Sequence, residues 1–140
     1  MAKFKLDIEY DYDFILIAIC SHDRDYRFCW AVNKNLNWDL QKQEQPIEIK
    51  DRKLESPLKF SVYYYQEAEI FTDYYIIVNK TNGVFLITEH KNVDYFMLIK
   101  GNLTTAEKDK LIIDLKQINN VLTAYEINPT TLSAKQYLQF

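Results

Sequence analysis

Two segments of this sequence are apolar on both faces of an extended strand, and they constrain the fold more than any other feature. Residues 14–20 are Phe-Ile-Leu-Ile-Ala-Ile-Cys, with no polar side chain. Residues 93–100 have apolar side chains at all four positions of one alternating set and at the two middle positions of the other. Strands of this kind lie inside a sheet that is covered on both sides. We expect one face of the second strand to carry Val93, Tyr95, Met97 and Ile99, and the other to carry Asp94, Phe96, Leu98 and Lys100.

Two other segments have the periodicity of amphipathic helices. The first helix is expected over residues 26–36, after a polar loop at residues 21–25. The second follows Thr104, because the Thr104 hydroxyl and the Glu107 carboxylate form a capping box that satisfies two free backbone N–H groups. The apolar stripes are Phe28, Cys29, Val32 and Leu36 in the first helix and Leu111, Ile112, Leu115 and Ile118 in the second.

The other expected elements are strands rich in aromatic and β-branched residues. Asn82 and Gly83 form a turn that predicts a hairpin into residues 84–87. Residues 37–57 are polar and contain two prolines, so we expect a mobile loop there. Residues 47–50 are an alternative short strand within it. The full set of further strands is expected at residues 3–9, 58–65, 72–78, 84–87 and 121–127.

The order of these elements predicts a single α+β domain over residues 1–140. A mostly antiparallel sheet of about five to seven strands would carry two main helices on one face. The order approximates a ferredoxin-like, split β-α-β arrangement with an added hairpin. We expect the C-terminal tail, residues 129–140, to pack on the domain. The opposite sheet face needs a cover, which the tail, a second copy of the chain or a partner would supply.

Composition and charge argue against several function classes. The 17 Lys and Arg residues and 20 Asp and Glu residues give a net charge of −3, which disfavours capture of nucleic acid. The N-terminal residues lack an apolar signal segment, and the longest apolar run has seven residues, so we expect a cytoplasmic protein without membrane insertion. The two glycines, Gly83 and Gly101, are both explained by chain turns, which leaves none for a phosphate-binding loop.

The chemistry-bearing residues include no recognisable catalytic motif. Cys20 and Cys29 lie in apolar runs, and we expect both to be reduced core residues rather than parts of a disulfide or metal site. No pattern typical of a nucleophilic or metal-dependent enzyme occurs in the sequence. We therefore predict no catalytic residue, no metal and no cofactor.

Residues 87–101 contain the first candidate binding site. Asp94 stands at the start of a central strand, where a carboxylate needs a hydrogen-bonding partner. One interpretation is a structural carboxylate that fixes the preceding loop through backbone N–H groups. The other is a small polar site for a ligand or a partner, formed by Glu89, His90, Asp94 and Tyr95.

His22, Asp23 and Asp25 form a second constellation before the first helix. They resemble an anion site or a general-base pair, but ordinary helix N-capping is the favoured interpretation. Near the N-terminus, acidic side chains alternate with apolar ones, which indicates a solvated strand edge rather than a cation site. These acids are Asp7, Glu9, Asp11 and Asp13.

Tyrosine clusters are the third candidate, since the chain has 11 Tyr residues. Tyr63 and Tyr65 point to one face of their expected strand, and Tyr74 lies on the next strand. Cross-strand aromatic packing would account for all three. If that face is open, the same side chains would instead form a stacking platform for a partner or for single-stranded RNA.

A family resemblance covers nearly the whole chain. Residues 87–101, ITEHKNVDYFMLIKG, closely resemble the signature of the IPExxxVDY family, small uncharacterised proteins of Bacteroidetes bacteria. Residues 25–27, 124–129 and 138–140 are similar to other recurring segments of that family. Thr88 stands where the family has Pro, which restores a backbone donor and frees φ at that turn. The resemblance implies no established activity, substrate or cofactor.

Three functions follow as hypotheses. The leading one is a non-enzymatic protein-interaction or adaptor domain that uses a sheet face or edge, with a homodimer as one possible assembly. The alternative is a small-ligand-sensing module or small enzyme with a polar pocket near Glu89 and Asp94. The third is RNA binding through exposed strand aromatics.

Overall fold

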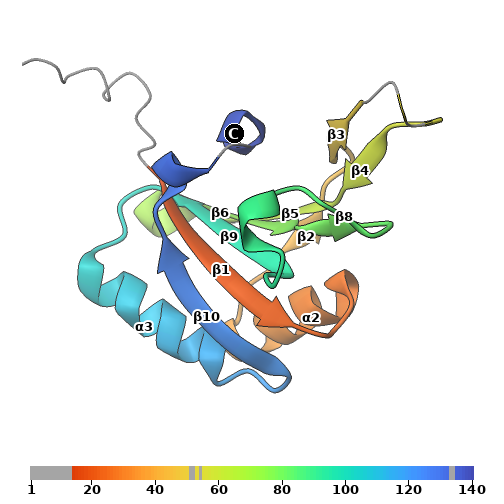
Figure 1. Ribbon diagram of the computed structural model, residues 1–140. Helices are drawn as coiled ribbons and strands as arrows, with labels where there is room; N and C mark the ends of the chain where they lie inside the picture. Colours follow the sequence, from red (N-terminus) through yellow and green to blue (C-terminus); the bar gives the residue numbers. More distant parts are fainter. Residues whose placement is uncertain (1–13, 51–52, 54, 133–134) are drawn as a thin grey trace, which may run out of the picture.

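The computed structural model describes residues 14–50, 53, 55–132 and 135–140, and a six-stranded sheet forms its centre (Figure 1). The strands lie in the order β10-β1-β9-β6-β5-β2, and every neighbouring pair is antiparallel. The strand expected at residues 3–9 lies outside the described residues. The strands are β1 (Ile15–Ser21), β2 (Gln41–Lys42), β5 (Val62–Glu67), β6 (Thr72–Val78), β9 (Tyr95–Lys100) and β10 (Val121–Ile127).

Two helices pack against one face of this sheet. They are α2 (Asp25–Leu36) and α3 (Thr105–Lys116). The predicted capping box begins α3: Oγ1 of Thr104 accepts a hydrogen bond from the Glu107 N–H at 3.1 Å, and Oε1 of Glu107 accepts one from the Thr104 N–H at 2.9 Å. Helix α2 ends at Asn37, whose backbone adopts the left-handed region with φ 57°.

The connection of strands and helices follows the expected topology. Counting β1, β6, β9 and β10 with the two helices, the chain runs strand, helix, strand, strand, helix, strand. In the sheet these four strands lie in the order fourth, first, third, second. This is the split β-α-β order, which β5 and β2 extend beyond β6. The predicted α+β fold, with a mostly antiparallel sheet and both helices on one face, is confirmed.

Two short hairpins lie outside the main sheet. Strands β3 (Ile47–Ile49) and β4 (Leu58–Phe60) form one, and β7 (Lys80–Thr81) and β8 (Val84–Phe85) form the other. The second hairpin turns at Asn82 and Gly83 as predicted, with φ of 51° and 79°.

Two expected strand boundaries are wrong. The segment 58–65 is two strands, because β4 pairs with β3 while β5 pairs with β6 in the main sheet. Strand β9 begins at Tyr95 rather than at Val93. Val93 therefore lies outside the alternation and packs on the side of the sheet opposite to Tyr95.

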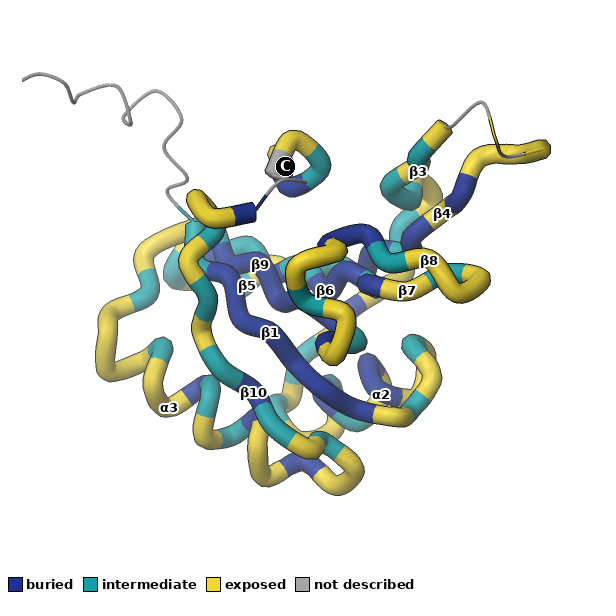
Figure 2. Tube along the Cα trace, viewed as in Figure 1, coloured by how far each residue is buried: buried dark blue, intermediate teal, exposed yellow. Residues whose placement is uncertain are grey.

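Both faces of the sheet are covered, as Figure 2 shows by the dark colour along β1 and β9. On one face the sheet packs against α2 and α3. On the other face it packs against the β3–β4 hairpin, residues 86–93 and C-terminal residues. The covering side chains on this second face are Leu58, Phe60, Leu86, Ile87, Val93, Leu132 and Leu138.

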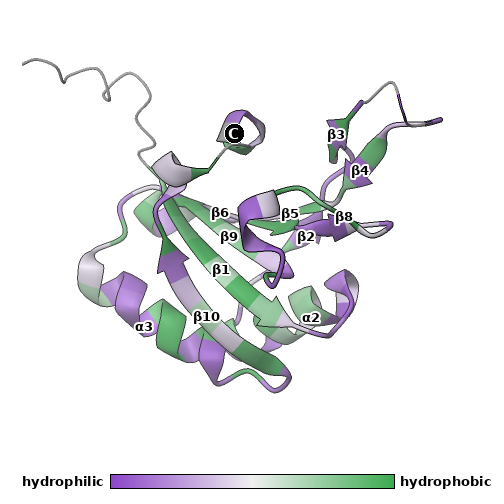
Figure 3. Ribbon diagram, viewed as in Figure 1, coloured by the Kyte–Doolittle hydropathy of each residue, from purple (hydrophilic) through white to green (hydrophobic). Residues whose placement is uncertain are grey.

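Hydropathy follows this layering. In Figure 3 the hydrophobic colour runs along β1, and hydrophilic and hydrophobic segments alternate along α3. None of the helices in the described part of the chain is long and apolar enough to cross a bilayer.

Candidate functional site

The outer face of α2 carries two large aromatic side chains that belong to neither of the two core clusters. Tyr26 is 63% exposed and Trp30 is 60% exposed. Lys34 continues the same line of the helix, because residues four apart lie one turn above each other. Its Nζ lies 5.0 Å from the centre of the Trp30 ring, within the range of a cation–π contact.

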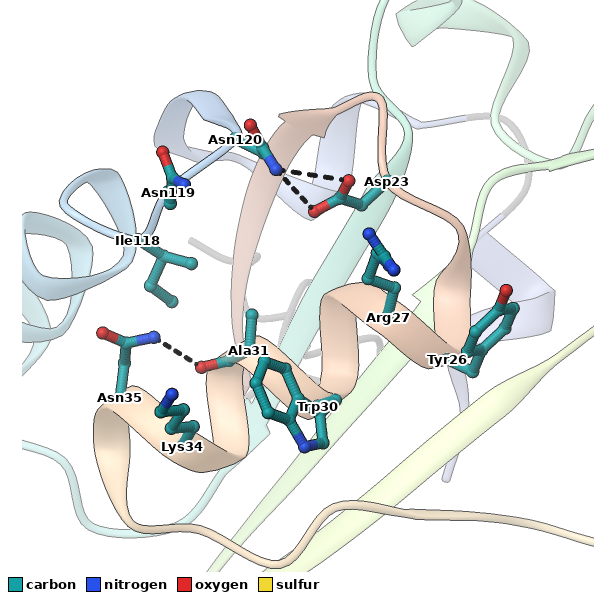
Figure 4. Close-up of a pocket in the computed structure, with 10 residues that line it drawn as sticks. All are labelled: Asp23, Tyr26, Arg27, Trp30, Ala31, Lys34, Asn35, Ile118, Asn119 and Asn120. Carbon is teal, nitrogen blue, oxygen red and sulfur yellow. Dashed lines mark hydrogen bonds between the residues drawn. The ribbon is translucent and has the colours of Figure 1, made fainter.

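This helix face forms one wall of an open groove of about 700 Å³ (Figure 4). The opposite wall is the turn between α3 and β10, which contributes Ile118, Asn119 and Asn120. Ile118 is buried and gives the groove an apolar floor. The Asn120 backbone has φ 73°, and its Nδ2 lies 3.4 and 3.5 Å from the two carboxylate oxygens of Asp23. We call this site the α2 groove.

A second cavity, of about 400 Å³, opens at the N-terminal end of α2. Three cationic side chains from three different elements line it: Arg24 before α2, Lys59 of β4 and Lys80 of β7. Tyr26 lines this cavity as well as the α2 groove, so the two sites are neighbours around one side chain. We call it the basic cavity.

Buried phenols support the backbone beneath both sites. The Tyr63 hydroxyl donates a hydrogen bond to Oδ2 of Asp25 at 3.0 Å, and the Tyr95 hydroxyl donates to the backbone carbonyl of Asp23. The Tyr95 ring stacks on Phe28, with 4.5 Å between the ring centres. Burial, with Asp25 nearby, raises the pKa of both Tyr63 and Tyr95 far above the usual phenol value. Both side chains are therefore neutral hydrogen-bond donors at neutral pH.

Asp94, the centre of the first predicted site, is bound to backbone. Its Oδ2 accepts a hydrogen bond from the N–H of Ser21 at 2.8 Å, at the end of β1. Glu89 is exposed on the 3-10 helix Thr88–His90, and the His90 ring meets Phe96 edge-on with 6.2 Å between ring centres. Asp94 thus fixes the end of β1, and Tyr95 binds the carbonyl of Asp23 two residues further on, between β1 and α2.

The predicted tyrosine platform faces the helices. Tyr63 is 6% exposed and Tyr74 is 3% exposed, both in the core beneath α2 and α3. Tyr65 is half-buried and stacks with Trp38 at 5.2 Å between ring centres, and Trp38 also meets Tyr74 at 4.2 Å. The alternative of an open aromatic platform is therefore wrong for Tyr63 and Tyr74, and the cross-strand packing interpretation, together with packing on the helices, explains them.

Tyr64 and Tyr75 point to the other face of the sheet. Their rings lie 5.0 Å apart, and Tyr75 stacks on Phe140 at 4.4 Å. The Tyr64 hydroxyl donates to Oδ1 of Asp73 at 2.6 Å, and this hydrogen bond raises the pKa of Tyr64 to about 12. C-terminal residues thus cover aromatic surface that an open sheet would expose.

The second predicted constellation is spread out rather than convergent. His22 is exposed, and the N-cap position of α2 is held by Arg24, without a side-chain capping bond. Asp23 meets Asn120 at the α2 groove, and Asp25 meets Tyr63 at the core. Ordinary N-capping by these acids is therefore wrong. The acids Asp7, Glu9, Asp11 and Asp13 lie outside the described residues.

Tyr26, Arg27 and Trp30 were not predicted as site residues from the sequence, although a signal is present. The apolar stripe of this helix passes through Cys29 and Val32. Tyr26 and Trp30 are large aromatic residues on a different line of the helix, one turn apart. An aromatic pair outside the buried stripe predicts exposed apolar surface, which marks interaction sites more often than core.

The described residues offer little for metal or redox chemistry. Cys20 and Cys29 are free and buried, and burial raises the pKa of both thiols. In the part of the chain that the structure describes, no three His, Cys, Asp or Glu side chains gather as a metal site requires.

A scan against protein-family models and searches of curated proteins and of solved structures found no match to this chain.

Proposed function

We propose that this chain is a non-enzymatic protein-interaction domain of the cytoplasm, and that the α2 groove is its docking site. The observation that carries the proposal is the exposure of Tyr26 and Trp30 at 63% and 60%, side by side in a groove of about 700 Å³. Tyrosine, tryptophan and arginine dominate the energetics of protein interfaces. Tyr26, Arg27 and Trp30 bring all three types together on one helix face.

The groove also has the mixed chemistry that a peptide segment needs. Its floor at Ile118 is apolar, while the amides of Asn119 and Asn120 offer donors and acceptors to a partner backbone. A segment of another protein would insert an apolar side chain between Trp30 and Ile118 and bind its own backbone to the asparagines. We therefore propose that the α2 groove binds a protein partner rather than a small molecule.

The other two hypotheses have weaker support. A ligand pocket around Glu89 and Asp94 is disfavoured because the Asp94 carboxylate already binds the Ser21 N–H. RNA binding through strand aromatics is disfavoured because Tyr63 and Tyr74 are buried and the chain carries a net charge of −3.

The test is selection from a random peptide library displayed on phage, with the purified protein as bait. We expect wild type to enrich a set of related peptides, and Tyr26→Ser/Trp30→Ser to lose at least about tenfold in affinity for them. Both side chains are exposed, so the double variant should keep its free energy of unfolding within about 0.5 kcal/mol.

Phe71→Asn is the matched control for this test. Phe71 is the most exposed large hydrophobic side chain of the described residues, at 76%, and Asn suits its left-handed backbone with φ 50°. Its removal should leave peptide binding unchanged. Peptides that bind wild type and Tyr26→Ser/Trp30→Ser equally would contradict the proposed docking site.

We further propose that a second copy of the chain pairs with the edge strand β10. In the described part of the chain, β10 pairs with β1 alone and has seven residues without Lys, Arg or Pro. Proteins usually protect such edges, as the opposite edge β2 is protected by its two-residue length and Lys42. Antiparallel self-pairing centred on Ala124 would place Val121 opposite Ile127, an apolar and β-branched pair.

Thr123→Lys tests this pairing, because two copies of the variant would bring ammonium groups together along the shared edge. Light scattering should give wild type twice the 16.8 kDa chain mass and the variant the chain mass alone. Gln41→Lys, at the other edge, should leave the dimer intact. A wild-type protein that stays at the chain mass at all tested concentrations contradicts the proposal.

We also propose that the chain belongs to the IPExxxVDY family. Asp94 and Tyr95 of the signature both bind backbone of the β1–α2 connection, at Ser21 and Asp23. These two bonds support a structural role for the pair, which orients the start of α2 and with it the α2 groove.

A further inference from the structure

We infer that the peptide segment recognised by the α2 groove is acidic, and that its carboxylates occupy the basic cavity. This inference rests on the proposed function and adds the chemistry of the partner. The two sites share Tyr26, so a bound segment that passes over this side chain reaches from one into the other.

The first argument is the origin of the three cations of the basic cavity. Arg24 precedes α2, Lys59 lies on β4 and Lys80 lies on β7, three elements that are far apart in the sequence. Lys59 and Lys80 are brought near each other because the Thr81 hydroxyl donates to the Lys59 carbonyl at 2.9 Å. Tertiary structure therefore places three cationic residues from separate segments around one cavity, where they can pair with an anionic group of a partner. Lys80 Nζ also lies 5.5 Å from the centre of the Phe85 ring.

The second argument is the charge balance of the combined surface. The two sites contain five cations, since Arg27 and Lys34 line the α2 groove. They contain two acids, Asp23 and Asp25, and both already accept hydrogen bonds from the protein itself. The surface is thus positive although the whole chain has a net charge of −3. A partner with carboxylates complements it and is steered toward it over several ångströms.

The third argument favours a peptide over a nucleic acid. Single-stranded nucleic acids bind by stacking bases on open aromatic faces. Lys34 Nζ lies 5.0 Å over the Trp30 ring and competes for one of its faces. Guanidinium groups such as those of Arg24 and Arg27 match the oxygens of a carboxylate and of a phosphate alike, so the preference for a peptide rests on the occupied Trp30 face and on the net charge of −3 of the chain. An acidic peptide with one apolar residue would pair its carboxylates with the cations of the basic cavity and place its apolar side chain in the α2 groove.

The experiment uses the peptides enriched on wild-type protein in the library selection. We expect these peptides to be rich in Asp and Glu beside an apolar residue. The variant Arg24→Gln/Lys59→Gln/Lys80→Gln should bind a synthetic copy of the strongest peptide about tenfold or more weakly. Its affinity should also depend less on salt than that of wild type, because fewer charge pairs form.

A control variant removes three charges at other exposed positions: Lys42→Gln/Lys91→Gln/Lys116→Gln. It has the same net charge as the test variant, so it separates local contacts from the charge of the whole protein. We expect its affinity for the peptide to stay within about twofold of wild type. Both variants should unfold at the wild-type urea concentration.

The possible results separate the inference from the proposed function. Peptides that depend on Tyr26 and Trp30 but lack acidic residues, or that bind the test variant as tightly as wild type, overturn the acidic partner and leave the docking groove standing. A selection that enriches nothing over Tyr26→Ser/Trp30→Ser overturns both. Tighter binding of fluorescein-labelled oligouridylate than of any enriched peptide, lost in the test variant, overturns the inference in favour of nucleic acid.

Discussion

Asn79→Ala should lower the free energy of unfolding by about 3 kcal/mol. The Asn79 side chain is fully buried, and its amide binds three backbone groups. Its Nδ2 donates to the carbonyls of His90 and Val93 at 3.1 and 2.8 Å, and its Oδ1 accepts from the Ile87 N–H at 2.8 Å. Alanine removes all three bonds. The His90 carbonyl still accepts from the Val93 N–H at 3.1 Å, whereas the Ile87 N–H and the Val93 carbonyl each lose a buried partner, at a cost of about 1 to 2 kcal/mol for each. Urea denaturation followed by circular dichroism measures the loss.

Asn35→Ala is the matched control for this prediction. Asn35 is an exposed residue of α2, and its Nδ2 donates to the Ala31 carbonyl at 2.8 Å. Since alanine favours helix and water replaces the lost bond, the change should stay within about 0.5 kcal/mol.

Asn79→Asp separates the role of the amide donors from that of the side-chain volume. The aspartate side chain has the same volume and keeps one acceptor oxygen, but its second oxygen replaces the amide donor that faces the carbonyls of His90 and Val93. At neutral pH we therefore expect Asn79→Asp to lower the free energy of unfolding at least as much as Asn79→Ala does. Losses no larger than that of Asn35→Ala would contradict the role of Asn79.

The main sheet and both helices were predictable from local patterns. The alternation in residues 93–100 identified β9 as a central strand, and β9 does pair with both β1 and β6. The capping box at Thr104 and the Asn82-Gly83 turn are formed as expected. Such signals are predictable because each depends on residues within a few positions of one another.

The cover of the second sheet face was not predictable in the same way. In the sequence, Asn79 looks like an ordinary turn residue. In the structure, its side chain holds residues 87–93 in place through hydrogen bonds to backbone groups eight to fourteen positions away. Strand alternation assigns residues to faces but does not say what packs on each face. For this reason Tyr63 and Tyr65 were correctly placed on one strand face, while the sequence left open whether that face is covered by helices or exposed.

The candidate site was missed for a related reason. The α2 groove needs the turn at Asn119 and Asn120 to face Trp30, and these residues are about ninety positions apart in the sequence. Nothing local to either segment predicts that meeting. The exposed pair of Tyr26 and Trp30 was the one feature that helical periodicity could have identified.

Gly101→Ala should lower the free energy of unfolding by about 4 kcal/mol. Gly101 follows β9 with φ 146°, a conformation that residues with a Cβ rarely adopt. A Cβ at this position would lie 2.7 Å from Cα of Thr72 and 2.8 Å from the carbonyl oxygen of Phe71. These are backbone atoms at the start of β6, so they cannot rotate away as the end of a flexible side chain does. The variant must strain its own backbone and also separate β6 from β9 at this end.

Gly83→Ala is the comparison variant, because Gly83 also has a positive φ but lies near the left-handed region and lacks the close approach. Gly83 has φ 79°, and a Cβ there would have no atom within 4 Å. We expect a loss of about 1 kcal/mol, the cost of a left-handed alanine. If Gly101→Ala loses no more than Gly83→Ala, backbone conformation alone explains both, and the contact with Thr72 contributes nothing. A clearly larger loss at Gly101 assigns the difference to the close contact of β6 with this position together with its φ of 146°, which is farther from the left-handed region than that of Gly83.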